Sequence, residues 1–286
     1  MSAKLQMTLS MVIYGTISLF VRHIPMTSAE VALFRACIAL ACLLIFRRLQ
    51  GQRVSLRETG GDVPWLFLSG AAMGFNWIFL FEAYRYTTVS VATLSYYFAP
   101  VLVMLACPLL FHERMTRRQV LCFIGSTVGL VLVVNPGGFS SGGTHLKGVA
   151  FGLAAAALYA SVILMNKRMT RASGIDRTLW QFAAASLVLL PYVLFTTGVD
   201  VSRMGPSGWA ALMVLGIVHS GVAYVLYFSA LGVLPGQESA ILSYIDPLVA
   251  CFLSVTVLGE PVTVLQVIGG IMILTFTLTN ELRDCA

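Results

Sequence analysis

The sequence contains ten apolar runs, most of them near twenty residues long, which follow one another from the N-terminal to the C-terminal end. About 20 consecutive apolar residues are the length that crosses a bilayer as a helix. The composition agrees: 58% hydrophobic and 10% charged residues, with a mean hydropathy of +0.87, lie outside the soluble range of roughly 45–50% apolar and about 25% charged. The sequence therefore predicts an all-α, polytopic protein of the lipid bilayer. The expected spans are 5–21, 29–46, 63–84, 89–111, 117–135, 147–166, 177–197, 206–231, 236–258 and 262–281.

The basic residues are distributed unevenly between the loops. Counted with the N-terminus inside, thirteen lie on the inner side: Lys4, Arg47, Arg48, Arg53, Arg57, Arg114, Arg117, Arg118, Lys167, Arg168, Arg171, Arg177 and Arg283. Four lie on the outer side, at Arg22, Arg85, Lys147 and Arg203. The positive-inside rule then predicts that both termini are cytoplasmic. The net charge of +6 is explained by topology, so no nucleic-acid partner is expected.

The segment Leu242–Pro247 resembles a segment of the chain 147 residues earlier. Aligning Pro247 with Pro100 pairs the following residues without a gap: Tyr244 with Tyr97, Ala230 with Ala83, Glu260 with Glu113, Thr263 with Thr116, Gln266 with Gln119 and Val267 with Val120. Seven coincidences at one offset indicate an internal duplication. We predict two five-helix repeats, over 1–136 and 144–282.

Pro100 and Pro247 interrupt two of the runs. Proline has no N–H, so the carbonyls of Tyr96 and Ser243, one turn earlier, lose their helical partners. In lipid such a group must face a polar cavity or another donor. Two broken helices at corresponding places in two repeats favour a substrate site near the membrane midplane. A kink that serves packing alone is the alternative.

Asp246 lies near the middle of the ninth run, on one helical face with Ser239 and Ser243. A charge at the bilayer centre costs about 2.5–3.5 kcal/mol on insertion scales, so such residues are functional candidates. Asp246 would bind a substrate ammonium group or take up a proton. The alternative is a neutral side chain, bonded to a tyrosine or a freed carbonyl, that serves packing.

Aromatic and polar side chains in other runs complete the predicted site. Tyr14 and Tyr159 lie near the middle of the first helix of each repeat. Each tyrosine fits helix packing and the lining of a cavity equally well. Asn76 must face protein or water, because an amide in hydrocarbon needs a partner. The predicted substrate-binding residues are Tyr14, Asn76, Trp77, Tyr97, Tyr159, His219, Tyr224, Ser243, Tyr244 and Asp246, with helix breaks at Pro100 and Pro247.

Other charged residues are given structural roles. Arg35 lies about a turn and a half inside the second run, and the favoured interpretation is that its side chain reaches the outer interface. Glu82 and Arg85 are expected to form a surface ion pair. Glu113 and Glu260 each precede a Thr-x-x-Gln capping box, where a carboxylate meets the positive end of the helix dipole.

Glycines mark close-packing faces in the fifth and tenth runs, at Gly125, Gly129, Gly269 and Gly270. Small residues let membrane helices approach closely, so these faces fit a neighbouring helix or a second protomer. Whether the protein is a monomer or a homodimer is left open.

Neither a metal, a cofactor nor an enzymatic activity is expected. The six cysteines lack metal or redox spacing, and no nucleotide-binding loop appears. An intramembrane enzyme would require Asp246 to pair with His219, without a second mid-membrane acid or a nucleophile beside a base.

The motifs and their order along the sequence resemble those of a known family over nearly the whole chain. Phe81-Glu82-Ala83-Tyr84, Pro100, Glu113 and Gln119 in the first half and Leu258-Gly259-Glu260-Pro261 in the second resemble the EamA-type members of the drug/metabolite transporter superfamily. Arg35 also fits, whereas His112 stands where a glycine is usual and Tyr14 where a tryptophan is frequent. The resemblance implies an inverted repeat and a central cavity lined by spans 1, 3, 4, 6, 8 and 9.

The resemblance also implies a function: alternating-access transport of small metabolites across the bacterial inner membrane, commonly outward. In general likeness the chain is closest to exporters of aromatic and other neutral amino acids. Aromatic faces from Tyr97, Tyr244 and Trp77, together with freed carbonyls and Asp246, suit a zwitterion with an apolar side chain. They equally suit organic cations such as choline or drugs. An amino-acid site further needs a donor for the carboxyl group, with His219, Asn76 or a tyrosine as the expected residue.

Overall fold

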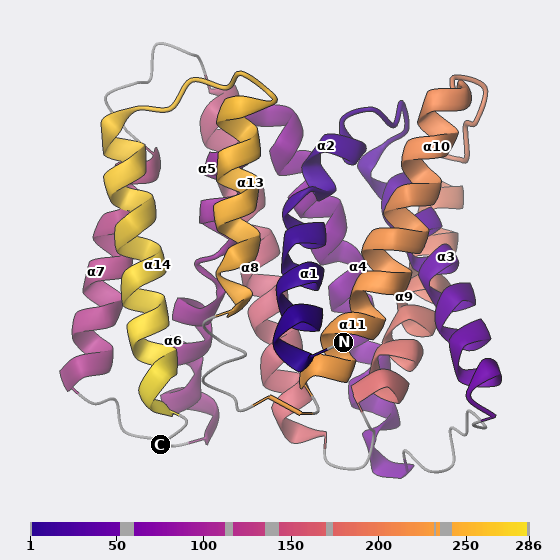
Figure 1. Ribbon diagram of the computed structural model, residues 1–286, viewed down its shortest axis with the longest axis horizontal. Helices are drawn as coiled ribbons and strands as arrows, with labels where there is room; N and C mark the ends of the chain where they lie inside the picture. Colours follow the sequence, from indigo (N-terminus) through magenta and orange to yellow (C-terminus); the bar gives the residue numbers. More distant parts are fainter. Residues whose placement is uncertain are drawn as a thin grey trace.

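The computed structural model describes residues 2–51, 60–111, 117–134, 143–169, 174–231, 233–234 and 242–284. Within these ranges all regular structure is helical (Figure 1), so the all-α prediction is confirmed. The first half contains α1 (Ala3–Gly15), α2 (Ile17–Val21), α3 (Ser28–Leu49), α4 (Val63–Tyr86), α5 (Val89–Tyr96), α6 (Ala99–Phe111) and α7 (Arg117–Val134). The second contains α8 (Thr144–Arg168), α9 (Gly174–Thr196), α10 (Pro206–Val214), the π-helix η3 (Leu215–Val222), α11 (Ala223–Leu231), α13 (Ile245–Thr256) and α14 (Val264–Asp284).

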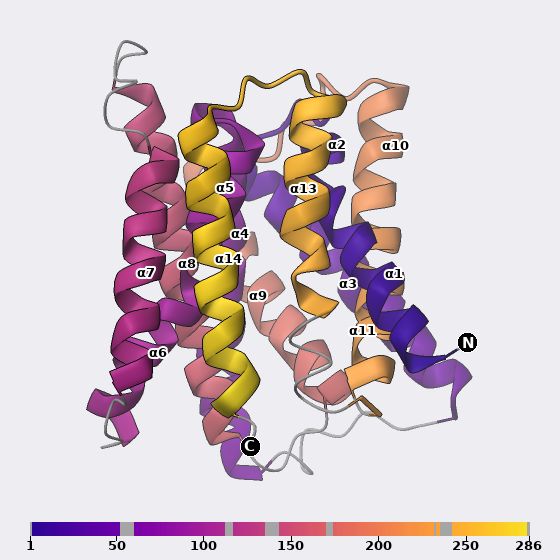
Figure 2. The same ribbon diagram turned by 60° about the vertical axis from the view of Figure 1, so that its left-hand side comes forward.

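The helices form a bundle whose members run in a common general direction in both views (Figures 1 and 2). Six stretches are long and apolar enough to cross a membrane: Ala3–Val21, Ser28–Leu49, Gly60–Tyr86, Thr144–Asn166, Ile175–Thr196 and Pro206–Ala230. Shorter apolar helices cover Val89–Val103, Val120–Val133, Ile245–Thr256 and Val264–Phe276. Large apolar side chains such as Phe195 and Ile271 are exposed, as expected of a surface that faces lipid. The number of crossings and the side on which the termini lie stay predictions.

The two halves of the chain interdigitate within the bundle. α4 packs along α8 and α9, α3 packs along α9 and η3, α1 packs along α11 and α13, and α7 packs along α14. In the two halves α1 is equivalent to α8, α3 to α9, and α4 to η3 with α11. The contact of α4 with α8 is therefore equivalent to that of α11 with α1, and the contact of α4 with α9 to that of η3 with α3. The pairs α3 with α9 and α7 with α14 map onto themselves. The halves are therefore related by an approximate two-fold exchange, and the centre of the bundle is built from both.

Several helices depart from regular α geometry at the centre of the bundle. The first span is interrupted by a turn at Thr16, between α1 and α2. Tyr97 and Phe98 form a turn between α5 and α6, just before Pro100, and Tyr244 forms a turn before α13, just ahead of Pro247. The π-helix η3 carries His219 and Ser220. Interrupted helices of this kind are frequent at functional sites in membrane proteins.

Glu260 joins the two halves at one end of the bundle. Its carboxylate accepts hydrogen bonds from the Val89 N–H, at 2.7 Å, from the Ser254 hydroxyl and from Arg22. The expected contact with the start of its own following helix is a wrong prediction, because the chain turns at Gly259, with φ of 63°, and directs Glu260 to the N-terminus of α5. The capping box itself is confirmed for the second half by mutual hydrogen bonds between Thr263 and Gln266. Glu113 and Thr116 lie outside the described residues.

Removing this carboxylate should weaken the fold. The Glu260→Ala substitution leaves the Val89 N–H without its charged acceptor, so we expect a loss of about 1.5–3 kcal/mol of stability. The thermal midpoint of the purified protein in detergent measures it. Glu82→Ala is the matched control, because Glu82 pairs with Arg85 at 3.6 Å in a more exposed, salt-screened position. Equal midpoints for the two variants would contradict the assignment.

The glycine faces predicted from the sequence pack against neighbouring helices of the same chain. Gly129 of α7 and Gly269 of α14 meet backbone to backbone: a Cβ on Gly129 would lie 2.8 Å from the Gly269 carbonyl oxygen. Gly125 lies against Phe276, and Gly270 lies against Leu94. Figures 1 and 2 both show α7 beside α14. These glycines therefore account for helix packing within one chain.

Candidate functional site

A cluster of tyrosines occupies the centre of the bundle. Tyr14 of α1 meets Tyr224 edge to face, with ring centroids 5.6 Å apart, and Tyr227 at 6.5 Å. Both partners come from α11, in the opposite half of the chain. The packing of α1 along α11 thus brings two of the predicted substrate-binding residues, Tyr14 and Tyr224, into contact.

A second group of tyrosines surrounds the turn between α5 and α6. Tyr96 lies 5.3 Å from Tyr159 of α8 and 6.0 Å from Tyr97. Tyr97 lies 6.4 Å from Tyr244, at the turn before α13. Tyr159 is 39% exposed, the most open of these rings. Tyr97 and Tyr244, which the alignment pairs, therefore face each other from corresponding turns of the two halves.

Asp246 joins this second group. The Tyr97 hydroxyl donates a hydrogen bond to Asp246 Oδ2 at 2.8 Å. Asp246 lies in the first turn of α13, where the positive end of the helix dipole stabilises a carboxylate. Its side chain is partly exposed, and Oδ1 has no hydrogen-bond partner among the described residues. The Oδ2 atom is therefore engaged by Tyr97, while Oδ1 can accept a hydrogen bond from a ligand.

Gly15 allows α1 to approach α13 at this point. A Cβ on Gly15 would lie 2.8 Å from the Asp246 carbonyl oxygen and 2.6 Å from Val249 Cβ. Glycine is needed because any side chain would push the helices apart. The close approach places Tyr14, the preceding residue, on the helix that packs directly against the start of α13.

His219 lies apart from Asp246 in its bonding. Its Nε2 is 2.8 Å from the Thr16 hydroxyl, and its Nδ1 is 3.2 Å from the Val214 carbonyl oxygen. The ring is 1% exposed and packs against Phe20 at 5.0 Å. His219 thus links η3 to the break in the first span. Within the described residues, the hydrogen bonds of His219 go to Thr16 and Val214, and that of Asp246 comes from Tyr97.

Asn76 and Trp77 occupy different environments although they are neighbours in α4. The Asn76 side-chain amide donates to the Ala155 carbonyl of α8 at 2.6 Å and is 2% exposed, so it fastens α4 to α8. Trp77 lies 5.3 Å from Phe182, which in turn lies 5.1 Å from Tyr224. Trp77 therefore adjoins the aromatic cluster, whereas the amide of Asn76 is engaged by the backbone.

Arg35, which was not among the predicted substrate-binding residues, is buried beside the aromatic cluster. Its side chain is 3% exposed, and its Nε donates to the Ser220 hydroxyl at 2.7 Å. The guanidinium lies over the Trp77 ring, 4.7 Å from the centroid. The predicted extension to the outer interface is wrong, because this face of α3 packs against η3 and α4, which supply a hydroxyl and an aromatic partner. The signal was the charge itself, since an ionisable residue within a span faces the bundle interior by default.

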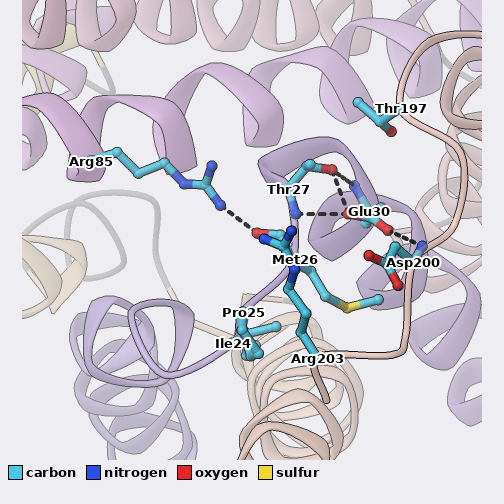
Figure 3. Close-up of a pocket in the computed structure, with 9 residues that line it drawn as sticks. All are labelled: Ile24, Pro25, Met26, Thr27, Glu30, Arg85, Thr197, Asp200 and Arg203. Atoms are coloured by element: carbon cyan, nitrogen blue, oxygen red, sulfur yellow. Dashed lines mark hydrogen bonds between the residues drawn. The ribbon is translucent and has the colours of Figure 1, made fainter.

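A separate pocket of about 400 Å³ lies at the ends of α3 and α4 (Figure 3). Its lining residues are Ile24, Pro25, Met26, Thr27, Glu30, Arg85, Thr197, Asp200 and Arg203. Glu30 accepts from the Thr27 backbone N–H and hydroxyl and from the Asp200 backbone N–H, each at 2.7 Å. Arg85 donates to the Met26 carbonyl. These polar groups hold the connecting segments, and the predicted substrate-binding residues lie elsewhere.

Three further residues of the ninth run were part of the prediction. Ser243 lies in a helical turn directly before Tyr244. Pro247 is buried in the first turn of α13. Ser239, which was expected to share the Asp246 face, lies outside the described residues.

Comparisons with known proteins agree with this architecture. The EamA-like transporter family matches the chain twice, over residues 1–135 and 146–280. The uncharacterized transporter YxxF of Bacillus subtilis is 30% identical over 95% of this chain and 87% of its own length. An uncharacterized transporter of Archaeoglobus fulgidus is 30% identical over 93% of this chain and 91% of its own length. Protein PecM of Dickeya dadantii is 27% identical over 73% and 70%, respectively.

A solved crystal structure shares the fold. It covers 98% of this chain and 96% of its own, with a TM-score of 0.66 and 22% sequence identity. The duplicated family match covers nearly all of the sequence, and the helices are those of a membrane protein. The chain therefore belongs to the EamA-like transporter family of the drug/metabolite transporter superfamily and is a multi-pass transporter of the bacterial inner membrane.

Proposed function

We propose that this transporter exports neutral or aromatic amino acids by alternating access and binds them among the central tyrosines and Asp246. The observation that carries the proposal is the Tyr97–Asp246 hydrogen bond, which joins the interrupted helices of the two repeats at 2.8 Å. Tyr244 and Tyr14 complete the aromatic surroundings. The site lies between the repeats, where a change in their relative position changes access.

The chemistry of the cluster suits a substrate with an ammonium group and an apolar side chain. A carboxylate with one open oxygen accepts hydrogen bonds from an ammonium group, and tyrosine faces attract the same cation. The rings also bury an apolar or aromatic side chain. A substrate ammonium group can replace the Tyr97 hydroxyl as the hydrogen-bond donor to Asp246. The Tyr97 hydroxyl is then available to bond the substrate.

Organic cations are the second candidate substrates. An aromatic cage with one carboxylate is a recurrent binding site for quaternary ammonium groups, and the Tyr97, Tyr244 and Asp246 group has this composition. The two candidates differ in one chemical group, the carboxylate of the amino acid, which needs a donor of its own.

Counterflow in proteoliposomes tests the proposal. Separate vesicle batches are preloaded with phenylalanine, threonine or choline, and entry of the matching radiolabel is followed without an imposed ion gradient. We expect entry of the amino acids and little entry of choline. Entry of choline alone would establish the second candidate and overturn the first. Export is then tested separately in cells, as slower accumulation of the same amino acid when the transporter is produced.

We further propose ten membrane spans from the apolar runs, repeats at 1–136 and 144–282 from the aligned residue pairs, and cytoplasmic termini from the distribution of basic residues. Alkaline phosphatase fused after Ala286 should be inactive, whereas a fluorescent protein fused there should fluoresce. Phosphatase fused after Gly198, in the connection between α9 and α10, is the control and should be active. The reverse pattern would invert the topology.

A further inference from the structure

Arg35 carries a buried charge that the protein itself leaves partly unpaired. Its guanidinium has five N–H donors, and the Nε–H is used by Ser220. The two terminal Nη groups have no hydrogen-bond acceptor among the described residues. Three other arginines of the described ranges form ion pairs with carboxylates: Arg22 with Glu260, Arg47 with Asp176 and Arg85 with Glu82. Arg35, at 3% exposure, does not.

Aromatic contacts offset part of the cost of burying this charge. The guanidinium lies 4.7 Å from the centroid of Trp77 and 5.8 Å from that of Phe81. Cation–π contacts of this kind are weaker than the penalty for removing an ion from water. A buried cation is retained at such a cost where an anion completes its coordination, so the free Nη groups indicate a missing anionic partner.

The position of Arg35 connects this missing partner to the proposed substrate site. Ring contacts lead from Trp77 through Phe182 to Tyr224, with centroid separations of 5.3 and 5.1 Å. Tyr224 lies 5.6 Å from Tyr14, and the next residue, Gly15, packs against the Asp246 backbone. A buried cation and a partly exposed carboxylate therefore border one aromatic region, from α3 on one side and from α13 on the other.

Ser220 fixes the direction of the guanidinium. Its hydroxyl accepts from Arg35 Nε and donates to the Leu215 carbonyl, five residues earlier, at 3.1 Å. This spacing is that of the π-helix η3. With Nε anchored, the two Nη groups form the fork that matches a carboxylate in a bidentate pair.

We propose that Arg35 binds the carboxylate of the transported amino acid, while Asp246 binds its ammonium group. This inference rests on the proposed amino-acid transport and specifies its substrate class as zwitterions. It replaces His219 and Asn76 as the expected carboxylate donors, because those side chains are bonded to Thr16, Val214 and Ala155. Ser220 is a positioning residue for the guanidinium.

The test compares phenylalanine with phenethylamine, which has the same ring and ammonium group but lacks the carboxylate. In counterflow, wild-type protein should prefer phenylalanine. Arg35→Gln should lower phenylalanine entry by roughly a factor of thirty or more, while phenethylamine entry stays equal or rises. Arg85→Gln is the matched control, because Arg85 bonds Met26 in a connecting segment, and its substrate preference should be that of wild type.

Two further variants keep the test valid if Arg35→Gln does not fold. Arg35→Lys keeps the charge but loses the fork, and Ser220→Ala frees Nε; both should raise the KM for phenylalanine with little change for phenethylamine. Unchanged preference in the folded variants, or an equal loss of both substrates, would overturn the role of Arg35. Failure of the proposed function is distinguishable, because wild-type protein would then exchange no amino acid at all.

Discussion

Replacing Asp246 by asparagine should lower phenylalanine counterflow by about thirtyfold or more, because removing one partner of a desolvated charge pair costs at least about 2 kcal/mol of binding. Asparagine has nearly the same shape, and its side-chain oxygen still accepts from the Tyr97 hydroxyl. Substrate binding thus loses a charge while the packing is preserved.

The same substitution should leave the thermal midpoint equal to that of wild type or raise it. A neutral amide at the bundle centre avoids the cost of burying a carboxylate. The control is Asp200→Asn, because Asp200 is exposed in the connection between α9 and α10 and its side chain bonds the neighbouring Ser202. Wild-type flux in the folded Asp246→Asn protein would remove Asp246 from the substrate site.

Replacing Gly269 by valine should cost about 3 kcal/mol or more of stability, because overpacking is most damaging where it meets backbone that cannot rotate away. A Cβ at Gly269 would lie 2.4 Å from the Gly129 carbonyl oxygen and 2.9 Å from the Val133 backbone nitrogen. The side chain therefore forces α7 and α14 apart along their crossing.

Gly61→Val is the matched control for this prediction. A Cβ at Gly61 has no heavy atom within 4 Å, so its thermal midpoint in detergent should stay close to that of wild type. Loss of the folded protein for Gly269→Val, with normal yield for Gly61→Val, is the expected result. Similar midpoints for both variants would show that α7 and α14 are not packed at this glycine pair.

The helical architecture was predictable because its causes are local. Apolar length decides whether a segment can cross a bilayer, and the backbone of such a segment satisfies its hydrogen bonds within itself. The duplication was equally visible, because gapless residue pairs such as Tyr97 with Tyr244 survive as a fixed offset. Turns lie just before Pro100 and Pro247. Pro191, however, stands inside α9, and the break at Thr16 has no proline, so proline alone does not predict which helices are interrupted.

The roles of individual polar residues were harder to predict, because they depend on which helix lies opposite. Asn76 was expected to face inward, and it does so toward the Ala155 carbonyl rather than toward the tyrosines. His219 was a candidate carboxylate donor, and its ring instead contacts Thr16 and Val214. The contact of Glu260 with the start of α5 joins segments 171 residues apart, which no local pattern indicates.

The sequence by itself determined the class of protein, the approximate positions of its long apolar helices and the repeat that joins its halves, because apolar length and residue order act within each segment. The tertiary structure alone decided the direction of Arg35. The helices are apolar on almost every face, so hydrophobicity cannot set their rotation. Packing of α3 against η3 and α4 sets it, and turns the guanidinium toward Ser220 and Trp77 instead of the membrane surface.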